Sequence, residues 1–214
     1  MADTESLGQA GVMWLEKLAD AEEGGVRIPT ITDPRGTDFS KASMLGQADW
    51  MLELEQRAID AFVRLGVSMT DTCINYQTVL AATRGEHVAF GDTGVVIYSN
   101  SVGGARSNFE GGPSALSAGL TGRTPRYGYH LDPHRQATLR IRTDWTPRTL
   151  DDWGALGGIV GRLSNNYWQV PLLEGLEAAP TSEQLKHFRA AMAGFGSAAR
   201  FHRRTTVSRS TCAL

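Results

Sequence analysis

The chain has 214 residues, of which 41% are apolar and 21% are charged, and its formal net charge at pH 7 is −2. This composition is typical of a soluble globular protein with one sizeable core, and basic residues spread along the chain give no reason to expect a nucleic-acid partner. No run approaches the roughly 18 apolar residues of a membrane helix, and the N-terminus lacks a basic region followed by an apolar one. We therefore expect a cytoplasmic protein with no nucleic-acid or membrane partner.

The first third of the chain is predicted to hold two amphipathic helices. Apolar residues recur at helical spacing from Leu7 to Glu23, and Gly24-Gly25 ends that pattern. Val26–Ile28 has the composition of a short strand, broken by Pro29. From Asp49 to Leu65 apolar residues step by three and four, which predicts the clearest helix of the chain.

The middle of the chain is rich in glycine and polar residues. His87–Phe90 and Gly94–Tyr98 are predicted to be strands around the turn Gly91-Asp92-Thr93. The run SNSVGGARSNFEGG that follows carries donors and acceptors suited to a small anionic ligand, and its glycines let backbone N–H groups approach such a ligand closely. A long, solvated surface loop is the alternative. Gly112–Leu120 is predicted to be a helix of small residues that packs close to a neighbour.

The second half alternates strands and helices. We expect strands at Ala137–Arg142 and Val170–Leu173, a helix at Thr149–Leu163, and a further helix that opens with the capping-box pair Thr181–Gln184. Strands that alternate with helices favour the α/β class with a mostly parallel sheet and flanking helices.

The last residues form a separate segment in this interpretation. No acidic residue follows Glu183, and Arg200–Leu214 shows neither helical nor strand periodicity. We expect residues 200–214 to be a disordered basic tail and residues 1–199 to form the folded domain; a tail that grips a phosphate or a partner is the alternative.

Cys73 is the most reactive group that the sequence offers. It lies among threonines, an aspartate, an asparagine and a tyrosine, whereas a structural cysteine is normally buried among apolar side chains. That neighbourhood favours a metal or iron–sulfur ligand or a nucleophile, and a plain thiol is the alternative. With Cys212 as the only other cysteine, a disulfide framework is not expected.

The histidines are less informative. His130 and His134 are four residues apart, but Pro133 between them argues against a helix that presents both to a metal. His87 is expected to cap the entrance to a strand. For each of the three, a solvent-facing or hydrogen-bonded state is predicted.

Four motifs together resemble one known family. The runs PTITDPRGTDF, TDTCINYQ, GDTGVVIYSNSVGGARSNFEGG and GLTGRTPRYGYHL are similar, in this order, to the catalytic large subunit of the aconitase X family. The similarity runs from the first helix to about Phe201. The variants TDP and GDT resemble the cis-3-hydroxy-L-proline dehydratase branch of that family.

The resemblance implies a fold and an activity. The fold is an aconitase-like α/β assembly, and the activity is that of a hydro-lyase that uses an iron–sulfur cluster or a single iron. The implied reaction is dehydration of cis-3-hydroxy-L-proline to a pyrroline-2-carboxylate, with mevalonate 5-phosphate as the alternative substrate. The implied protein partner is the small (swivel) subunit or domain of the family.

The resemblance also implies roles for particular residues. Cys73 matches the metal-ligand cysteine, and Arg106, in preference to Arg35, is expected to hold the substrate carboxylate as a bidentate fork. The implied catalytic residues are Asp92, Thr93 and Ser101, and the implied substrate-binding residues are Asp33, Pro34, Asn100, Arg106 and Asn108. The general base is not identified.

Family members are considerably longer than this chain. We therefore expect a domain that is partial at both ends, with the other ligand cysteines in a second half that follows the region of similarity. One cysteine cannot hold an iron–sulfur cluster alone. Two further hypotheses are an inactive fragment of the same family and a non-enzymatic module that binds an acidic metabolite.

Overall fold

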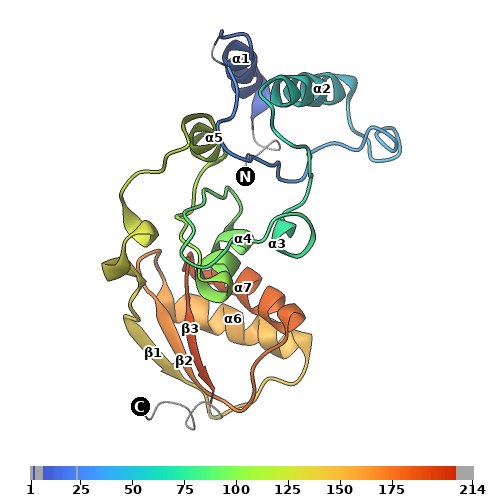
Figure 1. Cartoon of the computed structure of the whole chain (residues 1–214). Coiled ribbons are helices and arrows are strands. Elements are labelled where there is room, and N and C mark those ends of the chain that lie inside the picture. The colour runs from blue at the N-terminus through green and yellow to red at the C-terminus, as the bar shows by residue number, and fades with distance from the viewer. Residues whose placement is uncertain (1, 3–6, 23, 206–214) are drawn as a thin grey trace. The chain divides into compact units, whose positions relative to one another are not determined.

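The computed structural model describes residues 2, 7–22 and 24–205, and the chain folds into two compact units (Figure 1). Unit 1 comprises residues 1–81, 88–92 and 109–125, and unit 2 comprises residues 82–87, 93–108 and 126–214. No helix in the described part of the chain is long and apolar enough to cross a membrane.

Figure 1 labels the α-helices and the strands, which are numbered in chain order. The elements are α1 (Gly8–Ala19), α2 (Asp49–Arg64), α3 (Asn75–Thr78), α4 (Thr93–Tyr98), the π-helix η1 (Ser99–Gly103), α5 (Gly112–Thr121), the short 3₁₀-helices η2 (Gly128–His130) and η3 (Asp132–Arg135), β1 (Leu139–Arg142), α6 (Leu150–Ser164), β2 (Pro171–Leu176), α7 (Ser182–Gly196) and β3 (His202–Thr205).

Unit 1 is built around helices α1 and α2, which pack along their apolar faces. Their shared core holds Leu15 and Phe62, both at most 1% exposed, together with Leu116 from α5. The guanidinium of Arg57 donates two 2.8 Å hydrogen bonds to the carboxylate of Glu16 across the pair. The two helices predicted from periodicity are therefore confirmed, and burial of their apolar faces is what holds them together.

Helix α5 approaches its neighbour as closely as its small residues predict. A Cβ atom on Gly119 would lie 2.5 Å from Oγ1 of Thr30, and the carbonyl of Gly119 accepts a 2.8 Å hydrogen bond from the backbone N–H of Arg27. The backbone N–H of Val26 likewise donates to the carbonyl of Leu65, at the end of α2. Val26–Ile28 therefore binds to helices α5 and α2 and forms no strand, so the prediction of a strand there is wrong.

Unit 2 contains a parallel sheet with the strand order β1-β2-β3. Leu139 pairs with Pro171, and Leu172 pairs with His202. Helices α6 and α7 connect the strands and lie on the same face of the sheet (Figure 1). The predicted α/β class with a parallel sheet and flanking helices is confirmed.

The two helices of unit 2 pack backbone against backbone. A Cβ atom on Gly157 would lie 2.0 Å from the carbonyl oxygen of Phe188, and one on Gly196 would lie 1.8 Å from that of Gly161. Both helices begin with capping boxes, at Thr149 and at Thr181, as the sequence predicts for the second. Glycine is required at these contacts because no side chain fits between the two backbones.

Two strands predicted in the middle of the chain differ from the structure. Gly94–Tyr98 is not a strand, because Thr93–Tyr98 form helix α4, in which Val95, Val96 and Ile97 are 0% exposed. His87–Phe90 forms only isolated bridges, to Arg106 and to Phe109. A run of β-branched residues buried on every side has the same pattern in a strand and in a buried helix, so burial overrides strand propensity here.

The segment after Arg200 also differs from the prediction. His202–Thr205 form the edge strand β3, and Phe201 is 2% exposed and packs edge-on against the ring of Phe188 at 5.0 Å. The basic composition hides this strand, because arginines at an exposed edge break the alternation that identifies strands from sequence. Residues 206–214, with Cys212, lie outside the described residues.

Candidate active site

The residues that the sequence marks as functional belong to both units. Asp33, Pro34, Cys73 and Asp92 are in unit 1, and Thr93, Asn100, Ser101, Arg106 and Asn108 are in unit 2. The motif Gly91-Asp92-Thr93 therefore crosses from one unit to the other between its second and third residues.

In unit 1, two loops meet around the side chain of Thr32. Its Oγ1 accepts hydrogen bonds from the backbone N–H groups of Thr70 at 3.0 Å and of Asp71 at 3.2 Å, and it donates to Oδ1 of Asp71 at 3.1 Å. Asp71 has φ 49°, in the left-handed region that non-glycine residues seldom adopt. These bonds hold the loop of Asp33 and Pro34 against the loop that leads to Cys73.

The same two loops are joined by an ion pair between Arg35 and Asp71, with an N–O distance of 2.8 Å. The Arg35 guanidinium is thus already matched with a carboxylate. Asp33 is buried at 9% exposure, Asp92 is half-buried, and Cys73 is exposed. Exposure of the thiol agrees with a reactive or ligand role better than with a core role.

The described residues do not form a metal site by themselves. In residues 2, 7–22 and 24–205, no three histidine, cysteine or carboxylate side chains gather closely enough to hold a metal ion. An iron–sulfur cluster needs several thiolates, so the groups around Cys73 do not complete its ligand set.

Asn75, two residues beyond the thiol, is a residue that sequence reasoning left aside. It is 0% exposed, and neither its Nδ2 nor its Oδ1 has a hydrogen-bond partner. Burial of an amide without hydrogen-bond partners costs free energy of folding. In the sequence, only the position of Asn75 in the same motif as Cys73 could have marked this residue as functional.

In unit 2, helix α4 runs directly into the π-helix η1, which carries Asn100 and Ser101. π-Helical turns are frequent at functional sites. The amide of Asn100 is fully engaged: Nδ2 donates to the carbonyls of Ser107 at 2.8 Å and Ala199 at 3.1 Å, while Oδ1 accepts from Ser107 N–H and from Arg135. Asn100 therefore shapes the loop through its internal bonds.

Ser101 and Asn108 likewise bond to the chain itself. Oγ of Ser101 accepts a 3.0 Å hydrogen bond from the backbone N–H of Phe201. Oδ1 of Asn108 accepts from Tyr129 N–H at 2.8 Å and from the Tyr167 hydroxyl at 3.0 Å. Ser101 keeps a hydroxyl proton to donate, whereas Asn108 is 6% exposed and holds the following loop in place.

Arg135, which the sequence did not single out, anchors this region. Its guanidinium donates to Oδ1 of Asn100 at 3.0 Å, to the carbonyl of Tyr129 at 2.8 Å and to the carbonyl of Ala105 at 2.7 Å. Burial is the main cause that lowers the pKa of Arg135 to about 10, with nearby arginines adding to it. The side chain remains charged near neutral pH and joins η1 to η2.

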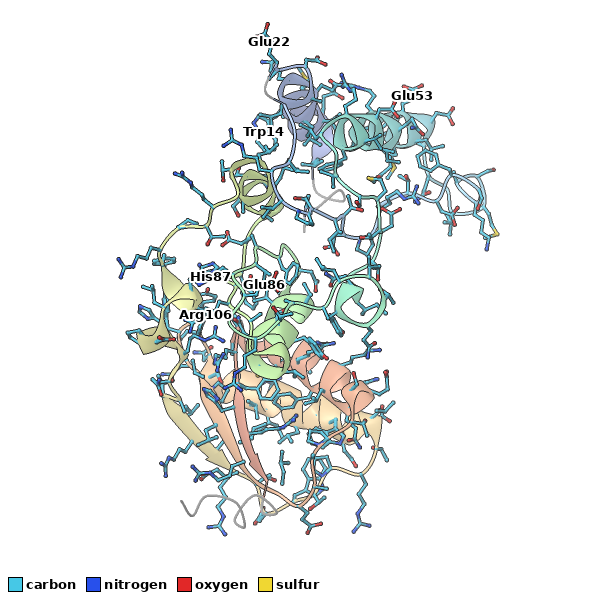
Figure 2. The ribbon with its side chains drawn as sticks, viewed as in Figure 1. Trp14, Glu22, Glu53, Glu86, His87 and Arg106 are labelled. Carbon is cyan, nitrogen blue, oxygen red and sulfur yellow. The ribbon has the colours of Figure 1, made fainter. Side chains whose placement is uncertain are left out.

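Arg106, the predicted carboxylate fork, has two partners of its own. Its Nη1 donates to the carbonyl of His130 at 2.9 Å, and its Nη2 forms an ion pair with the exposed carboxylate of Asp132. The backbone of Arg106 pairs with that of His87 in a parallel bridge, and Figure 2 shows the two side chains close together.

Beside this arginine lies a histidine pair that the sequence did not predict. Nδ1 of His87 and Nδ1 of His130 are 2.9 Å apart, and the ring planes differ by 15° with centroids 5.0 Å apart. His130 is 3% exposed and His87 is exposed. Each histidine is hydrogen-bonded, as predicted in general terms, but a separation of 43 residues leaves no sequence signal for the pairing.

Comparison with known proteins defines the class. The family model described as Aconitase X first domain matches residues 2–133, and the one described as Aconitase X second domain matches residues 137–207. The chain belongs to the aconitase X family, which confirms the resemblance carried by the four motifs.

Named relatives fall into two groups. The chain is 36% identical over 199 residues to the phosphomevalonate dehydratase large subunit of Methanosarcina mazei, covering 92% of this chain and 48% of the relative. It is 31% identical over 198 residues to the cis-3-hydroxy-L-proline dehydratase of Pseudomonas aeruginosa, covering 91% of this chain and 33% of that protein. The chain thus spans half or less of the length of these curated relatives.

A solved structure gives the same result for the fold. The crystal structure of Thermococcus kodakaraensis aconitase X in its holo-form matches this chain with a TM-score of 0.82 and 30% sequence identity. The match covers 100% of this chain and 54% of the other. The aconitase-like fold expected from the resemblance is confirmed, and this chain corresponds to about half of the neighbour.

Proposed function

We propose that this chain supplies about half of a hydro-lyase that removes water from a small hydroxy acid. The observation that carries the proposal is the ordered match of both aconitase X domains along residues 2–207. The relatives that share this order bear dehydratase names, and they belong to the carbon–oxygen lyases by that activity.

The first substrate candidate is cis-3-hydroxy-L-proline, which would yield a pyrroline-2-carboxylate. The motifs Thr32-Asp33-Pro34 and Gly91-Asp92-Thr93 resemble that branch of the family. The second candidate is mevalonate 5-phosphate, favoured by the higher identity of the phosphomevalonate dehydratase relatives, 36% against 31%. Both carry a carboxylate, and in both the hydroxyl is on the carbon next to the one that loses a proton.

In this proposal the residues of unit 1 and unit 2 have separate tasks. Asp33, Pro34, Asp92 and Thr93 face the substrate, and Ser101 retains a hydroxyl proton that can donate to developing negative charge. Arg106 attracts the substrate carboxylate through N–H groups other than those bonded to Asp132 and to the His130 carbonyl. Asn100 and Asn108 position the loop that carries Arg106, because their amides bond within unit 2.

Iron and a second polypeptide complete the proposed enzyme. Cys73 is one thiolate ligand of the iron, and the other thiolates come from polypeptide that corresponds to the rest of the relatives' length. The bound metal would act as a Lewis acid on the departing hydroxyl.

The proposed protein partner is a small subunit, as the words "large subunit" in the relatives' names suggest. The proposed location is the cytoplasm, which is a prediction from composition.

The decisive experiment is a dehydration assay with both candidates. The chain is purified anaerobically, alone and together with the second half and the small subunit of the Methanosarcina mazei enzyme. Each sample receives iron and sulfide, and the conversion of cis-3-hydroxy-L-proline or mevalonate 5-phosphate is followed by NMR. Conversion of one acid supports the hydro-lyase and selects the substrate. No conversion in any combination rejects the proposal.

A control separates an enzyme from a binding module. Cys73→Ala should abolish turnover and lower the bound iron, while calorimetric titration with the converted acid should still give heat. Heat without turnover in the parent chain would favour a non-enzymatic module instead. Absence of a cooperative melting transition would favour an inactive fragment.

A further inference from the structure

The general base of the reaction is absent from the motifs, and the structure offers one candidate. We infer that His87 is the base that takes the α-proton of the substrate, and that His130 is a positioning residue that holds His87 in the tautomer it needs. This inference rests on the proposed hydro-lyase function. It starts from the 2.9 Å contact between the two Nδ1 atoms and from the bridge that places His87 beside Arg106.

The geometry of the contact requires one shared proton. With ring planes only 15° apart and Nδ1 facing Nδ1, one imidazole must donate and the other must accept. In the proposed arrangement Nδ1–H of His87 donates to Nδ1 of His130, so Nε2 of His87 carries a lone pair. That atom belongs to the exposed member of the pair.

The surroundings keep the second proton off His130. The pKa of His130 is lowered to about 4, mainly by desolvation on burial and in smaller part by His87, Arg135 and Arg106. Its Nε2 is buried and has no hydrogen-bond partner that would stabilise a cation. A neutral His130 therefore accepts a hydrogen bond from His87 both before and after His87 becomes protonated.

The charged groups around His87 are few. Arg106 lies beside it, with Asp132 paired to that arginine, and the carboxylate of the adjacent Glu86 is bonded to Thr83 through the backbone N–H at 2.7 Å. Figure 2 shows Glu86, His87 and Arg106 near one another. A carboxylate drawn to Arg106 would lie beside the residue that carries the base, because the backbones of His87 and Arg106 form a bridge.

The step balances in protons and electrons. The C–H bond at the α-carbon breaks, and its proton goes to Nε2 of His87. Its electron pair forms the new carbon–carbon double bond while the C–O bond to the β-carbon breaks. The hydroxide that leaves takes a proton from the solvent and becomes water, and His87 returns the α-proton to the solvent. The sum is loss of one water from the substrate, with no oxidation or reduction.

Nitrogen NMR tests the pair without any need for turnover. In the full chain with ¹⁵N-labelled histidine, we expect a protonated Nδ1 on His87 and an unprotonated Nδ1 on His130. In His130→Gln the Nδ1 signal of His87 should shift, whereas His134→Gln, at an exposed histidine outside the pair, should leave it unchanged. An unprotonated Nδ1 on His87, or a His87 signal that His130→Gln leaves unchanged, would overturn the inference.

Kinetics tests the catalytic role in the assembled enzyme. His87→Gln should lower kcat at least 100-fold with KM changed less than about threefold, and His130→Gln should lower kcat about tenfold and displace the rising limb of the pH–rate profile. A His87→Gln enzyme that keeps a third of the parent's kcat would overturn the inference and leave the hydro-lyase intact. A parent enzyme that dehydrates neither acid rejects the proposed function, and the inference with it.

Discussion

At the scale of single residues, the hydrogen-bond partners of a polar side chain, more than its residue type, decide whether it is available to bind a ligand. Asn100 and Asn108 carry the amides that the sequence marks for a ligand, yet both amides bond to backbone groups of unit 2. Ser101, in the same motif, keeps a donor available. The residue types could be predicted from the motif, but the partners could not, because Asn100 bonds to Ala199 across 99 residues of sequence.

Arg135 gives the clearest stability prediction at this scale. Arg135→Lys should lower the free energy of unfolding by about 2–3 kcal/mol, because an ammonium group cannot reach Asn100, Ala105 and Tyr129 together and leaves buried carbonyls without donors. Urea unfolding followed by circular dichroism measures the change. The matched substitution Arg140→Lys, at an exposed arginine of β1, should change stability by no more than about 0.5 kcal/mol. Equal effects of the two would contradict the role given to Arg135.

At the scale of elements, local signals were reliable and buried ones were not. The Thr181–Gln184 capping box needs only residues three apart, and it forms as predicted. Helix α4 was predicted as a strand, since Val95–Ile97 is apolar on every side and has no periodicity that distinguishes the two structures. Packing against the rest of the fold decides between helix and strand here, and a local stretch of sequence does not reveal that packing.

The N-terminus of α6 makes a pH-dependent contribution. Backbone N–H groups of Thr149 and Arg148 donate to Asp152 at 2.9 Å each, and these bonds lower the pKa of the Asp152 carboxyl below its ordinary 3.8. A carboxyl whose folded pKa is depressed stabilises the fold above its unfolded pKa and loses that contribution as pH falls through the folded pKa. The stability difference between the parent and Asp152→Asn should therefore be largest above pH 5 and shrink below pH 4.

Chemical unfolding at several pH values measures that difference. Asp151→Asn is the control, since within the described residues the Asp151 carboxylate makes no hydrogen bond to these amides. A stability gap for Asp152→Asn that stays constant down to pH 3 would show that the charge of the capping carboxylate does not matter.

The glycines of α6 allow a matched comparison of packing against helix propensity. Gly161→Ala should destabilise unit 2 by about 1–3 kcal/mol, because its Cβ would lie 2.6 Å from the carbonyl oxygen of Met192 on α7. Gly154→Ala, in the same helix with nothing within 4 Å of the added atom, should stabilise it by about 0.5–1 kcal/mol. Thermal melting of both variants checks the opposite signs. Destabilisation by both would show that α6 needs glycine for a reason other than its contact with α7.

At the scale of the whole molecule, the sequence predicted one folded domain over residues 1–199, whereas the chain forms two compact units. Between residues 81 and 126 the chain passes from one unit to the other several times. The boundary therefore falls inside motifs such as Gly91-Asp92-Thr93, and the sequence shows no linker. The candidate site could be predicted as a set of motifs by resemblance. The pairing of His87 with His130 could not, because it depends on two loops of unit 2 that only the fold brings together.

Two separate cores predict that each unit loosens on its own. Phe62→Leu, in the core of α1 and α2, should raise amide exchange rates about tenfold or more in unit 1 and leave α6 and α7 protected. Gly161→Ala should do the reverse, since its contact lies wholly within unit 2. Hydrogen exchange followed by mass spectrometry resolves the two regions by peptide. If either variant raised exchange to the same extent in both regions, the chain would open as one cooperative body. The effect of one core residue would then have to pass through the segments in which the chain crosses between the units.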